Sequence, residues 1–365
     1  MTRGAHKTFA EFFAGVGLVR LGLSRAGWEC VFANDIDKTK AAIYKNNFEG
    51  NHFVLGDVRH LKPSQIPPCA LATASFPCTD ISLAGARRGI RGKQSGAFFG
   101  FASRLAGMRS AKPKLLLLEN VPGLLTVNGG KDIHETLKTL NELGYGVDMF
   151  VMDARWFTPQ SRPRLFVVGV HGAGRKGDVA GLTGRDEKLR PKTLVRVASS
   201  LEDIKWALNP IPAPPRNVSI KLRDIIEDVP DENFWPGEEV ENLLRQMSEK
   251  NISTVKQSLN SKSWVHATVF RRVRKNQVAA EPRFDGVAGC LRTPRGGSSR
   301  QILLRLGYGR VEARYLTARE YGRLQGAPDD FVIPPRQNAG LFAFGDAVCV
   351  PVIQWIGENV LNHLA

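Results

Sequence analysis

Short apolar runs alternate along the first half of the chain with segments whose apolar residues recur every three to four positions. The runs with the length of buried strands are residues 8–13, 30–33, 52–55, 70–76, 114–118, 145–152 and 165–170. Helical spacing follows Leu18 and recurs at 97–110 and 133–143. Strands that alternate with helices predict an α/β fold, a mostly parallel sheet with helices on both faces.

Glycines and acids follow the first three predicted strands. Gly15 and Gly17 begin a strand, glycine turn and helix, and such a unit is typical of nucleotide-type binding because glycine lets the backbone approach a ligand. Asp35 ends the second strand, where a carboxylate can accept hydrogen bonds from ribose hydroxyls, and Asp57 follows the third, where it can accept one from an adenine amino group. A helix N-cap is the alternative for such acids, above all for Asp37. The full G-x-G-x-x-G pattern is absent, so the ligand need not be a pyrophosphate.

A cysteine stands just beyond the strand at 70–76. Cys78 follows Pro77, and this is where open α/β sheets place reacting groups. The alternative is a small buried core residue, the usual role of a lone cysteine. The next residues, 83–96, are rich in glycine and arginine and include Arg87 and Arg88. They predict either a solvated surface loop or a cationic loop able to close over a polyanion.

Further polar residues follow later strands. Glu119 ends the leucine-rich run at 114–118. Arg162 and Arg164 come after Gln160, and alternate positions of an extended segment face one side, which suits an anionic ligand such as phosphate.

The character of the chain changes at about residue 172, because Gly, Lys, Arg and Pro dominate up to 215 without sustained periodicity. We expect residues 1–172 and 340–365 to form the first, catalytic domain and residues 173–313 an inserted second domain, with 314–339 as a hinge. A capping box at Thr317 and Glu320 predicts a helix at 316–325, and the amphipathic helix at 350–364 is expected to return to the first domain.

Charge indicates the partner. Lys and Arg number 51 against 35 Asp and Glu, a formal net charge of +16 over 365 residues. This balance favours a polyanion, most simply nucleic acid, over a merely basic soluble enzyme. Arginines at 292, 295 and 300, around the Gly296-Gly297 pair, suit base edges and phosphates, with a solvated loop as the alternative.

The spacing of the cysteines indicates whether a metal site is expected, and the hydropathy indicates whether a membrane span is expected. The five cysteines are scattered without a C-x-x-C pair, so we expect neither a zinc site nor a disulfide framework. We see no signal peptide and no apolar run near the ~18 residues of a membrane span. The expectation is a cytoplasmic protein with reduced thiols.

The motifs together resemble the DNA (cytosine-5)-methyltransferases of bacterial restriction-modification systems. They occur in family order over nearly the whole length: Phe13-Ala14-Gly15-Val16-Gly17, Asp35, Asp57, Phe76-Pro77-Cys78, Glu119-Asn120-Val121, Gln160-x-Arg162-x-Arg164, the region from Arg314 to Gly326, and the region from Gly345 to Gln354. Residues 175–310, the least covered part, stand where the family keeps its target-recognition region. The resemblance implies a Rossmann-like fold that binds S-adenosylmethionine, with a smaller inserted target-recognition domain.

The resemblance also assigns roles. Donor binding would involve Phe13, Gly15, Gly17, Asp35, Ile36, Asp57, Val58, Pro77, Asp346 and Ala347. Cys78 would be the nucleophile, Glu119 would contact the cytosine edge, and Arg162 and Arg164 would support the flipped nucleotide. DNA contacts are expected from Arg87, Arg88, Gln160, Arg292, Arg295 and Arg300. The sequence departs from the family pattern at Ser75, usually glycine, at Thr79, commonly glutamine, and at Asp346, usually asparagine, and it shows no acidic-x-arginine element before residue 97.

The expected chemistry explains these residue types. Addition of the Cys78 thiolate to C6 makes C5 of cytosine nucleophilic, which is covalent catalysis. Glu119 can neutralise charge near N3 if burial raises its pKa enough to keep a proton. The reacting atoms are inaccessible in a stacked duplex, so the target base must be flipped out.

The sequence alone leaves three alternatives to this function open. They are the same chemistry on RNA, as in tRNA methyltransferases with these motifs, a catalytically silent DNA-binding homologue, and a Rossmann oxidoreductase. The intact Pro-Cys, Glu-Asn-Val and Arg-x-Arg motifs disfavour the second, and the incomplete glycine pattern disfavours the third. We expect a monomer without a metal that acts on double-stranded DNA at the nucleoid, with a cognate restriction endonuclease as a possible companion.

Overall fold

The computed structural model describes residues 7–77, 96–182, 187–215, 218–274, 277–294 and 300–365. The chain forms two compact units. Unit 1 comprises residues 1–153, 163–214 and 352–365, and unit 2 comprises residues 154–162 and 215–351. Four residues with predicted roles lie outside the described part of the chain, namely Cys78, Arg87, Arg88 and Arg295.

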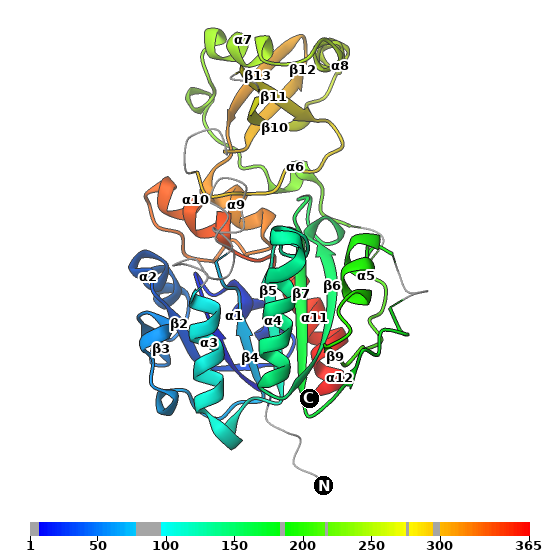
Figure 1. The fold of residues 1–365 in the computed structure, drawn as a ribbon. Coiled ribbons are helices and arrows are strands. Elements are labelled where there is room, and N and C mark those ends of the chain that lie inside the picture. Colours follow the sequence, from blue (N-terminus) through cyan, green and yellow to red (C-terminus); the bar gives the residue numbers. More distant parts are fainter. Residues whose placement is uncertain (1–6, 78–95, 183–186, 216–217, 275–276, 295–299) are drawn as a thin grey trace. The chain divides into compact units, whose positions relative to one another are not determined.

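A nine-stranded sheet forms the centre of unit 1, with strand order β3-β2-β1-β4-β5-β7-β6-β9-β8. Its strands are β1 (Thr8–Phe12), β2 (Glu29–Asp35), β3 (Phe53–Leu55), β4 (Leu71–Ala74), β5 (Leu115–Asn120), β6 (Tyr145–Asp153), β7 (Pro163–His171), β8 (Arg175–Lys176) and β9 (Lys205–Trp206). The first five are mutually parallel, whereas β7 runs antiparallel to β5 and β6. The predicted α/β class, with a mostly parallel sheet, is confirmed (Figure 1).

The strand order reverses between β1 and β4. From β1 the chain moves outward to β2 and β3, and then returns to the other side of β1 for β4 and β5. The carboxyl ends of parallel strands share one edge, so the residues after these five strands lie in one row. Ligands bind at such a switch point in open α/β sheets.

Helices cover both faces of this sheet. One face packs against α3 (Gly96–Gly107), α4 (Lys131–Glu142) and α5 (Lys192–Ser199) in a single buried apolar cluster. The opposite face of the sheet lies against α1 (Leu18–Arg25). Helix α2 (Lys38–Asn47) packs with the ends of β2 and β3. The C-terminal helical segment, α11 (Val350–Ile356), a π-helical turn (Gly357–Leu361) and α12 (Asn362–Leu364), returns beside α1, where Trp28 Nε1 donates to Asn362 Oδ1 at 2.9 Å.

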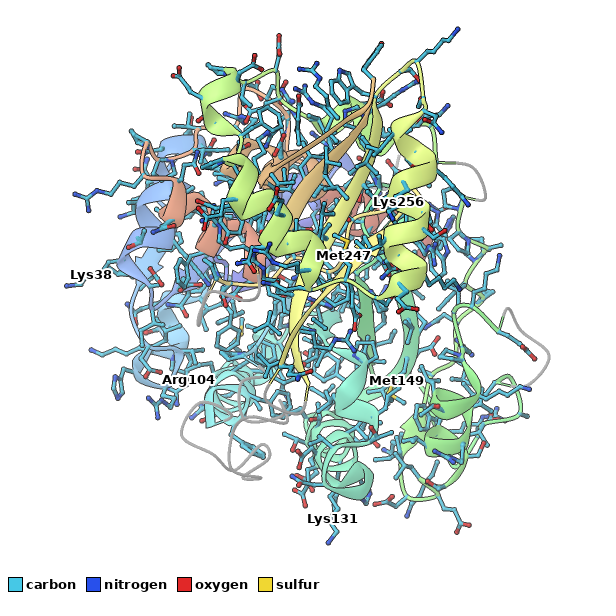
Figure 2. All side chains as sticks on the ribbon, turned by 90° about the horizontal axis from the view of Figure 1, so that it is seen from above. Lys38, Arg104, Lys131, Met149, Met247 and Lys256 are labelled. Carbon is cyan, nitrogen blue, oxygen red and sulfur yellow. The ribbon has the colours of Figure 1, made fainter. Side chains whose placement is uncertain are left out.

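Charged side chains lie at the surface of these layers and apolar side chains lie between them. In Figure 2 the labelled Lys38 and Lys131 project outward, whereas Met149, on β6, is fully buried. Lysine charges at the surface can attract a polyanion.

Residues 172–214 belong to unit 1, although their composition placed them at the start of the second domain. Nη2 of Arg190 donates to both carboxyl oxygens of Asp148 on β6, at 2.8 and 2.9 Å, and both side chains are almost fully buried. Trp206 is 2% exposed in the core of unit 1. The segment also contains a helix, α5, which the sequence did not predict. These contacts join residues far apart along the chain, so local composition did not reveal them.

Unit 2 contains a four-stranded antiparallel sheet with order β11-β10-β12-β13. Its strands are β10 (Val265–Arg274), β11 (Gln277–Arg283), β12 (Ile302–Gly307) and β13 (Arg310–Tyr315). One face buries apolar side chains against α7 (Gly237–Arg245) and α8 (Glu249–Leu259). Three further helices belong to this unit: α6 (Leu222–Ile225), α9 (Ala318–Leu324) and α10 (Gln337–Asp346).

The predicted capping box opens α9. Thr317 accepts the backbone N–H of Glu320, and the Glu320 carboxylate accepts the backbone N–H of Thr317 at 2.8 Å. Glu320 also forms a buried ion pair with Arg314, at 2.6 Å. The cap therefore joins the end of β13 to the start of α9.

One stretch, Gln337–Leu364, is long and apolar enough to cross a membrane by length and composition, contrary to the expectation from the sequence. In the fold it is interrupted between α10 and α11 at residues 347–349. Within its most apolar window, 67% is buried inside the structure, so core packing accounts for its composition.

Candidate active site

A glycine loop and an acid meet at the ends of β1 and β2. Asp35 is 9% exposed, and its two carboxyl oxygens accept the backbone N–H groups of Gly15 and Asp37, each at 2.8 Å. Gly15 has φ +56°, and a Cβ placed there would meet no atom of the described residues within 4 Å. The loop is therefore held by Asp35 while the space above Gly15 stays open, which fits a ligand that lies against the backbone.

Gly17 is required for a different reason. Its φ is +85°, and an added Cβ would lie 2.4 Å from the Phe48 ring and 2.9 Å from the Tyr44 ring. The residue also starts α1, whose first turn has no acidic side chain. Any larger residue would displace the loop from α2, so this glycine sets the position of the turn.

The ends of β2 and β3 offer an apolar surface next to polar groups. Ile36 is 65% exposed, which is unusual for a large aliphatic side chain, and it lies beside Asp35. The Asp57 carboxylate accepts from the Arg59 side chain at 2.5 Å, and this hydrogen bond lowers the pKa of Asp57 below its ordinary value. Val58 is buried in the core, so it supports the loop from beneath. An exposed aliphatic group near two carboxylates fits an adenosine moiety.

An acidic residue absent from the predicted site lies within β1. Glu11 is 1% exposed, and neither of its carboxyl oxygens has a hydrogen-bond partner among the described residues. Burial raises the pKa of Glu11 to about 8, an effect that Arg20 opposes and Asp35 reinforces. An acid inside an otherwise apolar strand was the available signal in the sequence.

Glu11 borders a chain of polar groups. Tyr44 Oη lies 3.2 Å from the Arg20 guanidinium, 3.1 Å from His52 Nε2 and 3.6 Å from Cys30 Sγ. Burial raises the pKa of the Cys30 thiol to about 12, with Glu11 adding to the shift, and burial lowers the pKa of His52. The group is thus an uncharged network around one arginine, beneath the glycine loop.

A side-chain amide forms a hydrogen bond between the segments at the ends of β4 and β5. Asn120 is 5% exposed, donates to the carbonyl of Phe76 at 3.3 Å, and accepts the backbone N–H of Val121 at 2.9 Å. This holds the segment that leads through the exposed Pro77 to Cys78, which itself lies outside the described residues. Asn120 is therefore a positioning residue, although its place in the Glu119-Asn120-Val121 motif alone predicted no role for it.

Glu119 lies next to this junction. Its carboxylate is 3.0 Å from Arg164 Nε, and both side chains are largely buried. Glu119 pairs in register with Phe166 on β7, so the two strands bring Arg164 beside it. The structure thus unites Glu119, Arg164 and the approach to Cys78 at one end of the sheet.

Arg162 belongs to unit 2 and has a different environment. It is 3% exposed and donates to the carbonyls of Leu291, Gly345 and Ala347 at 2.8, 3.2 and 2.7 Å. These contacts lie entirely within unit 2, so Arg162 joins segments that are far apart in the sequence.

Gln160 is also fully buried in unit 2. Its side chain donates to the carbonyl of Leu324 at 2.9 Å and accepts the backbone N–H of Leu291 at 3.3 Å. The predicted DNA contact by this residue would require it to leave these partners, and in the described structure it positions the segment around Leu291.

Asp346 and Ala347, predicted near the donor, follow a close backbone contact in unit 2. A Cβ on Gly345 would lie 2.6 Å from backbone atoms of Arg292 and Thr293, so only glycine fits there. Asp346 and Arg292 are exposed. The contact therefore places the exposed Arg292 on a rigid support.

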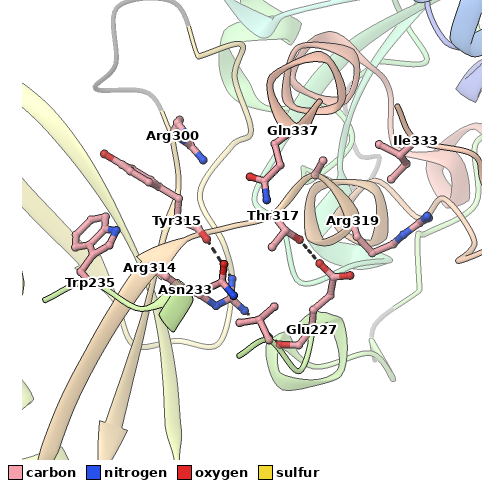
Figure 3. A pocket seen from close by; sticks show the side chains of 12 residues that line it. Glu227, Asn233, Trp235, Arg300, Arg314, Tyr315, Thr317, Arg319, Ile333 and Gln337 are labelled. Atoms are coloured by element: carbon pink, nitrogen blue, oxygen red, sulfur yellow. Dashed lines mark hydrogen bonds between the residues drawn. The ribbon is translucent and has the colours of Figure 1, made fainter. Parts of the chain in front are cut away.

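Unit 2 also contains a polar pocket of about 490 Å³ (Figure 3). Arg300 lies over the Tyr315 ring at 3.9 Å, and Tyr315 meets Trp235 edge-on at 5.0 Å. Thr317 donates to Glu227 on another wall. An arginine stacked on an aromatic ring presents its N–H edge to a ligand, which suits a phosphate or a base edge.

Known structures of the same shape define the class. The chain resembles the methyltransferase EhMeth of Entamoeba histolytica with a TM-score of 0.66 and 16% identity, covering 98% of each chain. It also resembles the Dnmt2 methyltransferase of S. pombe, with a TM-score of 0.59 and 17% identity over 98% of this chain and 99% of that one. Together with the loop at Gly15 and Asp35, these likenesses define a methyltransferase fold.

Sequence comparison identifies the family. The model of the C-5 cytosine-specific DNA methylase family matches residues 7–362, so the chain belongs to that family and is a DNA cytosine-5 methyltransferase. Two relatives are the type II methyltransferases M.Bsp6I of Bacillus sp. (strain RFL6), 28% identical over 97% of this chain and 98% of that one, and M.DsaV of Dactylococcopsis salina, 27% identical over 98% and 86%. The resemblance predicted from the motifs is confirmed.

Proposed function

We propose that this enzyme transfers a methyl group to C5 of a flipped cytosine in duplex DNA, as the protective enzyme of a type II restriction-modification system. The arrangement that carries the proposal is the row of groups after β1, β2, β4 and β5, in which Gly15 and Asp35 lie on one side of the switch point and Asn120 and Glu119 on the other. The type II methyltransferases among its relatives support the protective role.

The donor half of the site fits S-adenosylmethionine. Gly15 leaves room for close approach, Asp35 and Asp57 supply acceptors for ribose and adenine, and Ile36 offers an apolar surface for the ring. S-adenosylmethionine, when bound, supplies the methyl group that ends on C5.

The acceptor half of the site activates the base. Cys78 forms a bond from its thiolate sulfur to C6, and the electron pair of the C5–C6 double bond makes C5 nucleophilic. Glu119 contacts the cytosine edge at N3, and the Arg164 guanidinium at 3.0 Å holds the carboxylate in place. After C5 is methylated, a base removes the C5 proton, the C5–C6 double bond re-forms, and the sulfur leaves C6 as a thiolate.

Sequence recognition, in this proposal, belongs to residues 267–301 of unit 2. The motifs of the chemistry lie outside that segment, and it contains Arg292, exposed, and Arg300, stacked on Tyr315. The same proposal includes a monomer that acts at the nucleoid in the cytoplasm, with no metal and with a cognate endonuclease that cuts the unmethylated sequence.

The test is covalent trapping on DNA with 5-fluorocytosine at the target, because fluorine cannot leave as a proton. We expect wild type to form the adduct and Cys78→Ala to lose both adduct and methyl transfer while it still binds DNA. Cys69→Ala is the matched control, since burial raises the pKa of that thiol to about 11 and it should trap normally. An adduct with Cys78→Ala would contradict the nucleophile assignment, and methylation of RNA in preference to duplex DNA would contradict the substrate.

A further inference from the structure

The hairpin of β10 and β11 extends beyond the rest of its sheet. Strand β12 pairs with β10 only from Val265 to Val269, whereas β11 continues to pair up to Arg274 with Gln277. From Phe270 onward β10 is therefore half of a two-stranded ribbon. Four residue steps at ~3.4 Å make it roughly 14 Å long, and a ribbon of this kind fits the DNA major groove, which is about 12 Å wide and 8.5 Å deep.

The base of the ribbon is anchored. Arg271 donates to Gln246 at 3.1 Å and lies over the Trp235 ring at 5.5 Å, and the backbone N–H of Ala280 donates to the carbonyl of Gln246 at 2.9 Å. Ala280 is 2% exposed. The ribbon thus projects from a packed base, which lets its outer residues hold a defined position.

Two branched apolar side chains stand at its outer part. Val273 and Val278 are cross-strand partners, 60% and 45% exposed, so they share one face of the ribbon. Burial in the core does not explain an exposed pair of valines. An apolar side chain in the major groove contacts the C5 methyl group of thymine, the one apolar group on a base edge there.

Charge favours DNA as the occupant of this face. The sequence from Trp264 to Ala280 contains no acidic residue and includes Arg271, Arg272, Arg274 and Lys275. The nearest acid on the ribbon, Glu281, is paired with Arg272 at 3.4 Å. A positive ribbon with an apolar face suits a phosphate-lined groove better than it suits a protein surface of ordinary charge.

We infer that the β10–β11 ribbon enters the major groove of substrate DNA and that Val273 and Val278 read a thymine methyl group in the recognition sequence. The inference rests on the proposed function and adds a specificity contact to it.

The experiment compares two DNA substrates of one sequence, one with thymine and one with uracil throughout, which differ only in that methyl group. Incorporation of labelled methyl groups gives kcat/KM for wild type, Val273→Ala and Val278→Ala. We expect wild type to prefer thymine DNA about fourfold, the effect of one buried methyl group. The two variants should lose this preference and match wild-type activity on uracil DNA. Ile220→Ala, which removes a 41% exposed aliphatic side chain elsewhere in unit 2, should keep the preference.

Two results would overturn the inference: equal wild-type activity on both substrates, or equal losses of the valine variants on both. The second would indicate a steric or packing role. Melting temperatures check that the variants fold. Wild type that methylates neither substrate would instead contradict the proposed function, so the two failures are distinguishable.

Discussion

The glycine loop of unit 1, at Gly15 and Gly17, and the β10–β11 ribbon of unit 2 use side chains in opposite ways. At the loop, both carboxyl oxygens of Asp35 accept backbone N–H groups, and the Asn120 amide holds the segment before Cys78 by donating to the carbonyl of Phe76. In the ribbon, Val273 and Val278 lie beyond the packed part of the sheet and are exposed. Chemistry common to a family needs a rigid backbone, whereas the choice of sequence can be changed at exposed side chains without altering the fold.

Arg162 and Arg164 sharpen this comparison, because they are two residues apart and differ in role. Arg162→Met should lower the free energy of unfolding by about 3–5 kcal/mol, since three carbonyls lose the hydrogen bonds that the buried guanidinium donates to them. Arg164→Met should change it far less and reduce kcat instead, because the Glu119 carboxylate loses its partner. Urea unfolding and methyl transfer measure the two effects. A stable, inactive Arg162→Met enzyme would show that both arginines act in catalysis.

Glu11 tests whether the buried polar groups beneath the glycine loop are uncharged. Its pKa is raised to about 8, so between about pH 4.5 and 8 the unfolded chain releases this proton while the folded chain keeps it. Stability should therefore fall as pH rises through this window, by about 2–4 kcal/mol for this group. Glu11→Gln should remove that part of the dependence. Urea midpoints of both proteins at pH 5 and pH 8 give the difference, and identical pH dependence would contradict a protonated Glu11.

Asp35 and Asp37 are a matched pair on the same loop. Asp35→Ala should weaken S-adenosylmethionine binding by about 1–3 kcal/mol, because it loses acceptors for the ligand and for Gly15 N–H. Asp37 caps α2 by accepting from Thr39 and Lys40, so Asp37→Ala should cost about 1 kcal/mol of stability and leave the affinity unchanged. Calorimetry with both variants decides whether Asp35 belongs to the donor site.

The smallest expected effect concerns single phosphate contacts in unit 2. Binding of non-cognate DNA should weaken steeply with salt, because a net charge of +16 implies the release of several counterions. Arg292→Ala should reduce the slope of log affinity against log salt by about 1 if Arg292 holds a phosphate. An unchanged slope with a relaxed methylated sequence would identify it as a base reader instead.

Much of unit 1, and the start of α9 in unit 2, could be predicted because their signals are local. Gly15, Gly17 and Asp35 stand next to the strand ends that they serve, and Thr317 with Glu320 specifies a helix start within four residues. The family followed from these motifs in order.

Other features depend on partners far away in the sequence and could not be predicted. Residues 172–214 join unit 1 through the buried pair of Asp148 and Arg190, 42 residues apart. Gln160 suggested a DNA contact, yet its amide is buried against residues more than 130 positions away. For such polar residues, burial is decided by tertiary contacts that leave no local pattern.

The most direct test of the separation between chemistry and recognition is an exchange of residues 267–301 with the corresponding segment of a related methyltransferase of different specificity. The chimera is assayed by bisulfite sequencing of DNA from cells that express it. We predict that an active chimera methylates the DNA sequence recognised by the enzyme from which the segment was taken. A folded, active chimera that keeps the original sequence preference would contradict the account.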